Sequence, residues 1–438
     1  MNKRQVQWLY EELPGLVGQG VLPADAAERL RQHYGEPEAA GSTAKRWAIS
    51  LFSILGVTLI GGGIILLLAH NWEEFPRPVR TGLSLLPMLV AQGLAGYGVL
   101  RERASTAWRE VVGLLWAAGI GTSIGLVALT YHLSGDIGEF WLVWTLAGLP
   151  VAYLLGATVP ALLYLVGITV WTGSVLNCVA KEPLWYFPLL ALALPYWWQT
   201  SRANRYHLRP VLFAWVLAIT VCIATGLALA RAIDRLEVWP VLFGGLFGLL
   251  FLVGARWWGT TTSAWRQPLQ SVGVLGVLGL SLVLTFGDAW SHGRWHWEPV
   301  QTWRAAAEVA VVAVILVAAL ALWVRSWTRR GWHEMMVGAV PALATIGWVL
   351  DAKTKGLLGA GLFNLYLFGF GIGTLVIGLR RRRLATVNAG MAVFTVVILC
   401  RFADADLGFV LRGVAFIVIG LGFLVTNLVL LRQKGAAR

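Results

Sequence analysis

Charged residues are scarce in this sequence. Only 13% of its 438 residues are charged, whereas 58% are hydrophobic. In a soluble chain of this length about a quarter of the residues are charged, because charged side chains cover the surface. Most of the exterior must therefore face something other than water. This excludes a set of soluble domains and predicts an integral membrane protein.

The sequence also lacks the motifs of common metal, nucleotide and redox sites. Its three cysteines, Cys178, Cys222 and Cys400, lie far apart, and no CxxC pair occurs. We therefore expect inert buried thiols, with neither disulfides nor bound zinc. Neither a GxxxxGK(S/T) loop nor an HExxH motif is present. The sequence thus predicts no ATPase activity and no cofactor.

Negative charge is in short supply as well. The chain has 35 lysines and arginines against 22 acidic residues, which gives a net charge of +13. A nucleic-acid-binding surface needs basic residues clustered on one soluble face. Here they form short runs between apolar stretches, a pattern typical of membrane insertion. We therefore expect membrane lipids as partners and no nucleic acid.

Apolar stretches of about 20 residues, long enough to cross a bilayer, follow one another from residue 47 onward. We predict an all-α, polytopic transmembrane bundle of about fourteen helices in residues 47–438. The predicted spans are 47–69, 79–100, 111–130, 141–156, 159–179, 184–198, 210–230, 238–254, 269–287, 305–324, 335–350, 357–379, 384–400 and 408–431.

The first 46 residues are polar and form a separate region. A helix with an apolar stripe is predicted over Gln5–Val17, and a second one begins near Pro23 and ends at Gly35. Such a cytoplasmic helical hairpin is too small for a large core, so we expect it to pack on the membrane domain or on a partner protein. No apolar segment follows the basic start directly, and we expect no cleavable signal peptide.

Basic residues also predict the orientation. With a cytoplasmic N-terminus, about two thirds of the lysines and arginines fall in the inner segments, as expected when cations are retained inside. The run Arg380–Arg383 is the strongest single anchor. An even number of spans then places the C-terminus inside too. We predict a multi-pass protein of the inner, or plasma, membrane.

Two short outer loops contain recognisable motifs. The first span ends in Ala69-His70-Asn71-Trp72, followed by a proline, and Tyr131-His132-x-Ser134-Gly135-Asp136 follows the third span. With the N-terminal hairpin, these motifs resemble Domain of Unknown Function 2157, a family of predicted membrane proteins, over roughly residues 1–180. The family-like part of the membrane domain is thus about 47–180. Later residues, Arg401-Phe402-x-Asp404 and Arg412-Gly413, resemble the C-terminal region of related polytopic proteins. The resemblance implies an architecture and no activity.

Polar side chains of these loops form a predicted outer patch. One interpretation is a ligand site, because histidines and carboxylates gather on one side of the membrane. The other is that they cap helices and contact lipid headgroups. His292 and His296, four residues apart in another outer loop, are weak metal candidates. The residues of the patch are His70, Asn71, Trp72, Glu73, Arg77, Arg80, Tyr131, His132, Ser134, Gly135 and Asp136.

Polar residues inside the spans are the second set of candidates, because burying a charge or an amide in hydrocarbon is costly unless it is paired. They are Glu308, Asn364, Asn388 and Arg412. Glu308 would carry a proton or bind a cation, and Arg412 would hold an anion or a counter-charge. The alternative is that both charges snorkel to the outer interface. The amides would then bridge helices.

Three classes of function remain open. Many spans, short loops and prolines such as Pro341, which permit broken helices, favour a transporter or translocator of a small solute or lipid. A membrane scaffold or sensor that docks partners through the N-terminal hairpin is the alternative. A membrane enzyme acting on a lipid-linked substrate is less favoured, because no outer loop is large enough to hold an acceptor.

Overall fold

A computed structural model of the chain consists entirely of helices over the residues that it describes. The predicted all-α membrane bundle is therefore confirmed. The described ranges are 12–34, 72–100, 105–176, 182–259, 263–290, 303–329, 331–354 and 356–403, with isolated positions beyond residue 409.

The chain divides into two compact units, residues 1–80 and 81–438. In the first, residues 12–18 are helical and α2 spans Ala24–Tyr34. Between them Gly20 has a φ of +70°, a left-handed conformation that suits glycine. The predicted helical hairpin is thus present, with Leu13 as its most buried apolar side chain. The predicted boundary at residue 46 lies outside the described residues and stays a prediction.

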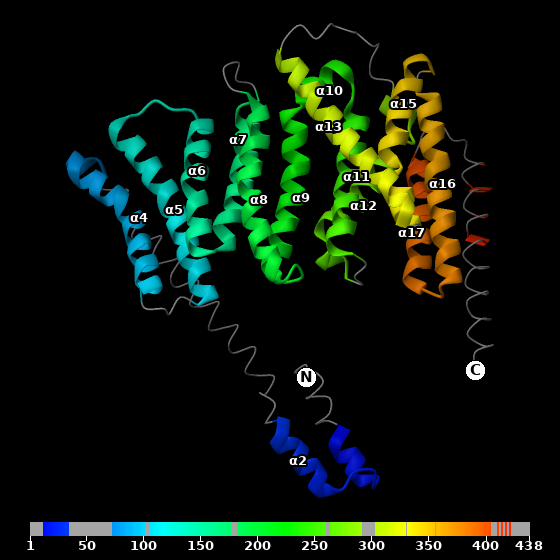
Figure 1. The fold of residues 1–438 in the computed structure, drawn as a ribbon, viewed down its shortest axis with the longest axis horizontal. Helices are drawn as coiled ribbons and strands as arrows, with labels where there is room; N and C mark the ends of the chain where they lie inside the picture. The colour runs from blue at the N-terminus through cyan, green and yellow to red at the C-terminus, as the bar shows by residue number, and fades with distance from the viewer. Residues whose placement is uncertain are drawn as a thin grey trace. The chain divides into compact units, whose positions relative to one another are not determined.

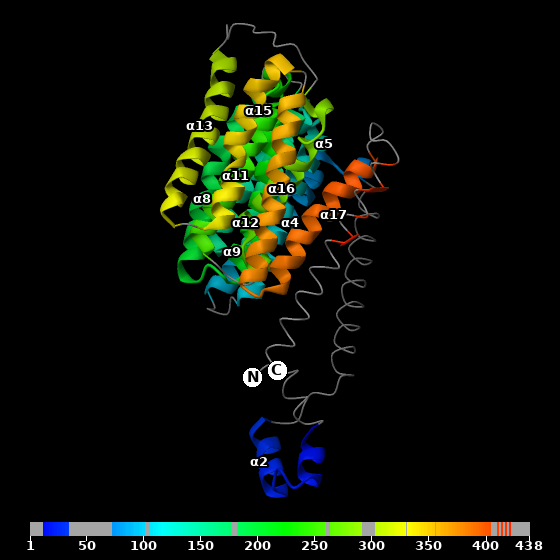
Figure 2. The same ribbon diagram turned by 90° about the vertical axis from the view of Figure 1, so that its right-hand side faces the viewer.

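The second unit is a bundle whose neighbouring helices largely follow chain order (Figure 1). Figure 2 shows the same bundle from the side, where α13 runs along one edge and α17 along another. Its principal helices are α4 (Arg77–Leu100), α5 (Thr106–Tyr131), α6 (Ile137–Leu155), α7 (Thr158–Ser174), α8 (Tyr186–Ala203), α9 (Leu208–Ala228), α10 (Ala230–Leu236), α11 (Trp239–Trp258), α12 (Pro268–Val283), α13 (Trp303–Ser326), α14 (Trp332–Gly338), α15 (Val340–Thr354), α16 (Leu357–Arg380) and α17 (Leu384–Ala403).

Eight helices of the described part are long and apolar enough to cross a membrane, and three shorter apolar helices accompany them. Twelve of the fourteen predicted spans coincide with a helix or, for 335–350, with the pair α14 and α15. The predicted span 47–69 lies outside the described residues, and 408–431 has only isolated described positions. The count of fourteen therefore stays a prediction. Sequence reasoning did not anticipate α10, a short helix after α9.

Glycine allows α11 and α12 to pack with their backbones in contact. A Cβ added at Gly254 would lie 2.5 Å from the backbone nitrogen of Gln270, and one at Gly273 would lie 2.5 Å from that of Phe251. Neither backbone can move aside without displacing a whole helix. The close approach of these two helices therefore depends on both positions being glycine.

A break interrupts the predicted span 335–350. Pro341, the second residue of α15, has no N–H to continue a helical ladder, and the chain turns at Ala339. The carbonyl of Met335 accepts a hydrogen bond from the Trp323 indole (2.9 Å). That of Met336 accepts one from the Tyr366 hydroxyl (3.1 Å) as well as one from the backbone N–H of Ala339 (3.2 Å). Side chains of α13 and α16 thus satisfy backbone groups that the break exposes.

We expect Tyr366→Phe to lower the free energy of unfolding by about 1 kcal/mol, because it removes one hydrogen-bond donor and little else. Trp323→Phe lowers it further, because it also removes part of an indole that packs against Gly338 and Trp327. Denaturant titration of the purified protein in bicelles measures the effect. Phe394→Leu, which changes apolar packing against α16 and no hydrogen bond, is the control for general loosening. Unchanged stability of both donor variants would mean that the break does not depend on these bonds.

Candidate functional site

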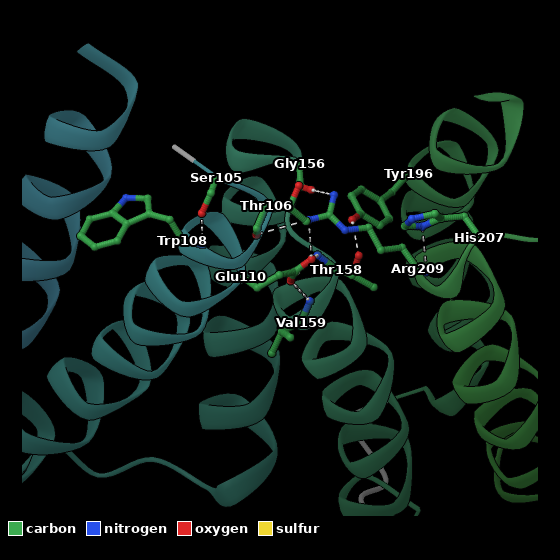
Figure 3. Close-up of polar contacts among 10 residues, drawn as sticks. All are labelled: Ser105, Thr106, Trp108, Glu110, Gly156, Thr158, Val159, Tyr196, His207 and Arg209. Atoms are coloured by element: carbon green, nitrogen blue, oxygen red, sulfur yellow. Dashed lines mark hydrogen bonds and ion pairs between the residues drawn. The ribbon is translucent and has the colours of Figure 1, made fainter. Parts of the chain in front are cut away.

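Two groups of charges lie within the helical bundle, and the first joins α5, α7 and α9 (Figure 3). Glu110 lies in the second turn of α5, whose N-cap Ser105 accepts a hydrogen bond from the backbone N–H of Trp108 (3.2 Å). The Glu110 carboxylate accepts from the backbone N–H of Thr158 (3.0 and 2.8 Å) and of Val159 (2.8 Å). It thereby caps α7, whose own N-cap, Ala157, has no side chain that can do so.

Arg209 completes this network from the first turn of α9. Its Nη2 lies 3.0 Å from Oε1 of Glu110, and its guanidinium also donates to the carbonyls of Gly156 and Thr106, both at 3.4 Å. Tyr196 and Thr158 share a hydroxyl–hydroxyl hydrogen bond of 3.2 Å beside it. Two helices separate each of the connections before α5, α7 and α9 from the next one, so all three connections belong on the same face of the membrane. The network joins them at that face.

Sequence reasoning missed Glu110 and Arg209. Both are charges at helix ends, where charges are ordinary, and nothing in their spacing relates one to the other. The signal that was available is the tight turn at Gly156, which leaves the start of α7 with no capping side chain of its own. An acceptor from elsewhere in the chain was therefore needed.

We expect Glu110→Ala to lower the free energy of unfolding by about 2 kcal/mol, because the start of α7 loses its cap and Arg209 its counter-charge. Glu110→Gln, which keeps one acceptor oxygen, loses about half as much. Arg209→Gln loses least, since the ion pair is partly open to solvent. Denaturant titration of the three variants gives this order. An equal loss in all three would contradict the capping role.

The second group of charges centres on α13. Arg304, in its first turn, forms an ion pair with Glu182, whose Oε2 lies 3.0 Å from Nε of the arginine. Glu182 precedes the short helix η2 (Pro183–Trp185) that leads into α8. The carboxylate side chain is 9% exposed and the arginine 36%. This ion pair therefore ties the start of α13 to the start of α8 at a largely buried carboxylate.

Glu308 lies one turn further along α13, on the same face as Arg304. It is 2% exposed, and its Oε2 has no hydrogen-bond partner among the described residues. The charges of Arg235 and Arg231, both on α10, attract the carboxylate, and Glu182 repels it. Arg231 also donates to the carbonyl of Leu176 at the end of α7 (3.4 Å). We name Glu182, Arg231, Arg235, Arg304 and Glu308 the Glu308 cluster.

The burial of Glu308 separates it from an ordinary interfacial acid. A snorkelling side chain places its charge in water or among headgroups. The Glu308 side chain is instead buried in the protein, on a helix that is long and apolar enough to cross a membrane. Ionisable groups in such positions are costly and typically functional. The Glu308 cluster is therefore the candidate functional site.

The other predicted intramembrane residues behave differently. Asn364 donates to the carbonyls of Thr285 (3.1 Å) and Ala360 (2.8 Å), so it links α16 to the end of α12. These contacts match the alternative in which the intramembrane amides bridge helices. Asn388 is exposed on α17. Arg412 lies outside the described residues, as do the metal candidates His292 and His296.

The first half of the predicted outer patch lies in the first unit. Trp72 is buried in the short helix η1 (Trp72–Glu74). Arg80 donates to the carbonyls of Phe75 (2.8 Å) and Glu73, while the side chains of Glu73 and Arg77 are exposed. Arg80 therefore shapes this loop through backbone contacts. His70 and Asn71 lie outside the described residues.

The second half of the patch lies in the second unit. Asp136 caps α6 by accepting from the N–H of Glu139 (2.7 Å), and His132 ends α5 with a φ of +48°. The Tyr131 hydroxyl bonds that of Thr81 (2.9 Å). Ser134 and Gly135 are exposed between these two helices. The contacts of this half therefore match the helix-capping interpretation.

Residues 14–161 match the family of predicted membrane proteins called Domain of Unknown Function 2157. This confirms the resemblance inferred from the two loop motifs, over the N-terminal part of the chain. Comparisons with curated proteins and with solved structures found no match. The matched part includes Glu110 and ends in the first turn of α7, so it includes neither Arg209 nor the Glu308 cluster. The C-terminal resemblance stays a prediction.

Proposed function

We propose that this chain carries a small solute across a membrane, with Glu308 as the group that exchanges charge with the solute or with water. One observation carries the proposal: a carboxylate buried in an apolar helix, with an oxygen that makes no hydrogen bond to the described residues. A purely structural acid would be expected to have partners, since an unpaired buried charge destabilises the fold. The orientation with both termini cytoplasmic is part of this proposal.

The placement of α13 supports a role in which this helix moves relative to its neighbours. α13 runs obliquely across its neighbours in Figure 1 and packs mainly on α11. Its first turns contain Arg304 and Glu308, and its last turns contain Trp323, which bonds the broken end of α14. Discontinuous helices recur in carriers, where they permit parts of the bundle to rock against each other. One helix thus connects the buried charge with the break.

Uptake by membrane vesicles tests the proposal without a known solute. Vesicles containing the full chain are incubated with an extract of small metabolites, and their contents are identified by mass spectrometry. We expect at least one solute to accumulate with the wild-type protein and to fall by about tenfold with Glu308→Ala, because the charge-exchanging group is lost. Glu74→Gln, an exposed carboxylate in η1, is the matched control and retains uptake.

Two results would contradict the proposal. One is a vesicle content that does not differ between wild-type protein and empty vesicles for any solute. The other is equal accumulation by wild type and Glu308→Ala, which would remove Glu308 from the pathway.

The scaffold alternative is supported by the hairpin, which belongs to the compact unit of residues 1–80 and leaves Val21 66% exposed at its turn. Deleting residues 1–40 separates the two functions. A carrier whose site is the Glu308 cluster keeps its uptake, since the deletion removes none of the cluster residues. A scaffold loses its partners instead, which crosslinking followed by mass spectrometry measures against the full chain. Loss of uptake together with an unchanged set of partners would contradict both assignments.

A further inference from the structure

The charges of the Glu308 cluster do not cancel. Three arginines face two glutamates when both carboxylates are ionised. A guanidinium stays charged at any physiological pH, so the three positive charges are fixed. The two carboxylates are the groups that can lose their charge. The cluster is therefore cationic in every protonation state, and it becomes more so when a proton binds.

The two carboxylates are held differently. Glu182 forms an ion pair with Arg304 at 3.0 Å, although neither of its carboxylate oxygens accepts a hydrogen bond from the described residues. Glu308 has no ion pair within 4.0 Å among the described residues, and Arg231 and Arg235 act on it across a longer distance. The field of two arginines without direct contact offsets only part of the cost of a buried negative charge. Glu308 is thus the carboxylate of the cluster that has no direct counter-charge among the described residues.

Other charged groups of the packed elements lie at the far end of α13. Arg256 of α11 donates to the carbonyl of Leu322, in the last turns of α13. His333 and Glu334 belong to α14, which follows the C-terminal end of α13. Among the described groups, the charges that act on Glu308 are therefore Arg231 and Arg235 from α10 and Glu182 before α8, and Arg304 is the ion-pair partner of Glu182.

We infer that the Glu308 cluster binds a small oxyanion, a carboxylate or a phosphate, together with one proton. The proton comes from water and adds to the Glu308 carboxylate, giving a neutral carboxyl. The oxyanion binds Arg231 and Arg235, whose field is then no longer opposed by Glu308. Guanidinium groups suit this ligand because their N–H donors match carboxylate and phosphate oxygens.

This inference rests on the proposed function, because it names the class of ligand that binds at the carrier's site. A cation is the less suitable occupant. It would enter a cluster that already contains three guanidinium groups, and one of the two carboxylates there is engaged by Arg304. Release of the proton at the opposite face restores the Glu308 charge, which repels the oxyanion. Binding and release of the two species are thereby coupled.

Binding to the purified full chain tests the inference. Acetate and dimethyl phosphate, two oxyanions whose charges are nearly the same at both pH values, are titrated by calorimetry in a chloride background, at about pH 5.5 and about pH 7.5. We expect saturable binding of at least one of them, about tenfold tighter at the lower pH, since one charge in the cluster has been neutralised. Glu308→Gln, which mimics the neutral carboxyl, binds equally well at both pH values.

Variants of the arginines locate the oxyanion. Arg231→Gln combined with Arg235→Gln loses binding by at least about tenfold, because the charge-assisted hydrogen bonds are gone. Arg231→Lys combined with Arg235→Lys keeps the charges and retains part of the affinity, which separates loss of the ligand contacts from misfolding. Asp234→Asn, an exposed acid of the same helix, is the matched control and binds as wild type.

The inference is overturned if neither oxyanion binds saturably, if the arginine-to-glutamine variant binds as wild type, or if Glu308→Gln keeps the full pH dependence. Saturable binding of sodium or ammonium in place of the oxyanions, with solute uptake intact in vesicles, overturns it while the proposed function stands. Coupled binding of proton and oxyanion without uptake of any solute supports the site and removes the proposed function.

Discussion

Hydrocarbon offers no hydrogen bonds, and this constraint shapes the whole bundle. Every backbone N–H and C=O within the membrane must find a partner inside the protein. Continuous helices satisfy most of them, and the exceptions show where the chain departs from regularity. The start of α7 obtains its acceptor from Glu110 on another helix, and the broken end of α14 obtains donors from Trp323 and Tyr366. Irregular backbone is thus accompanied by a side chain from elsewhere.

The same constraint explains which parts of the fold were predictable. Long apolar stretches can only be helices in a membrane, so the helical ranges followed from hydropathy alone. The helix α10 was missed because its seven residues, with two arginines and an aspartate, have no apolar run. The break at Ala339 was foreseeable only as a possibility, since Pro341 permits an interruption without requiring one.

The candidate sites were less predictable, for a physical reason. Glu308 was identifiable because a charge within an apolar stretch is unusual wherever it packs. Its neighbours Arg231, Arg235 and Glu182 lie between predicted spans, where charges are ordinary. They become part of a candidate site only because α10 and η2 pack near α13. Sequence could therefore locate one member of the cluster and not the others. The motifs of the two loops that were predicted to be outer, by contrast, proved informative about the family resemblance and about local helix ends.

The backbone contact between α11 and α12 has a mechanical consequence. Gly254 and Gly273 leave no space for sliding, and α11 also meets α15 where Gly248 faces Pro341. A Cβ added at Gly245 would lie 3.6 Å from Cα of Leu316, so α13 is packed closely on α11 as well. The spacing of α11 from three neighbouring helices is thus set by glycines, and a larger side chain at any of them would force two helices apart.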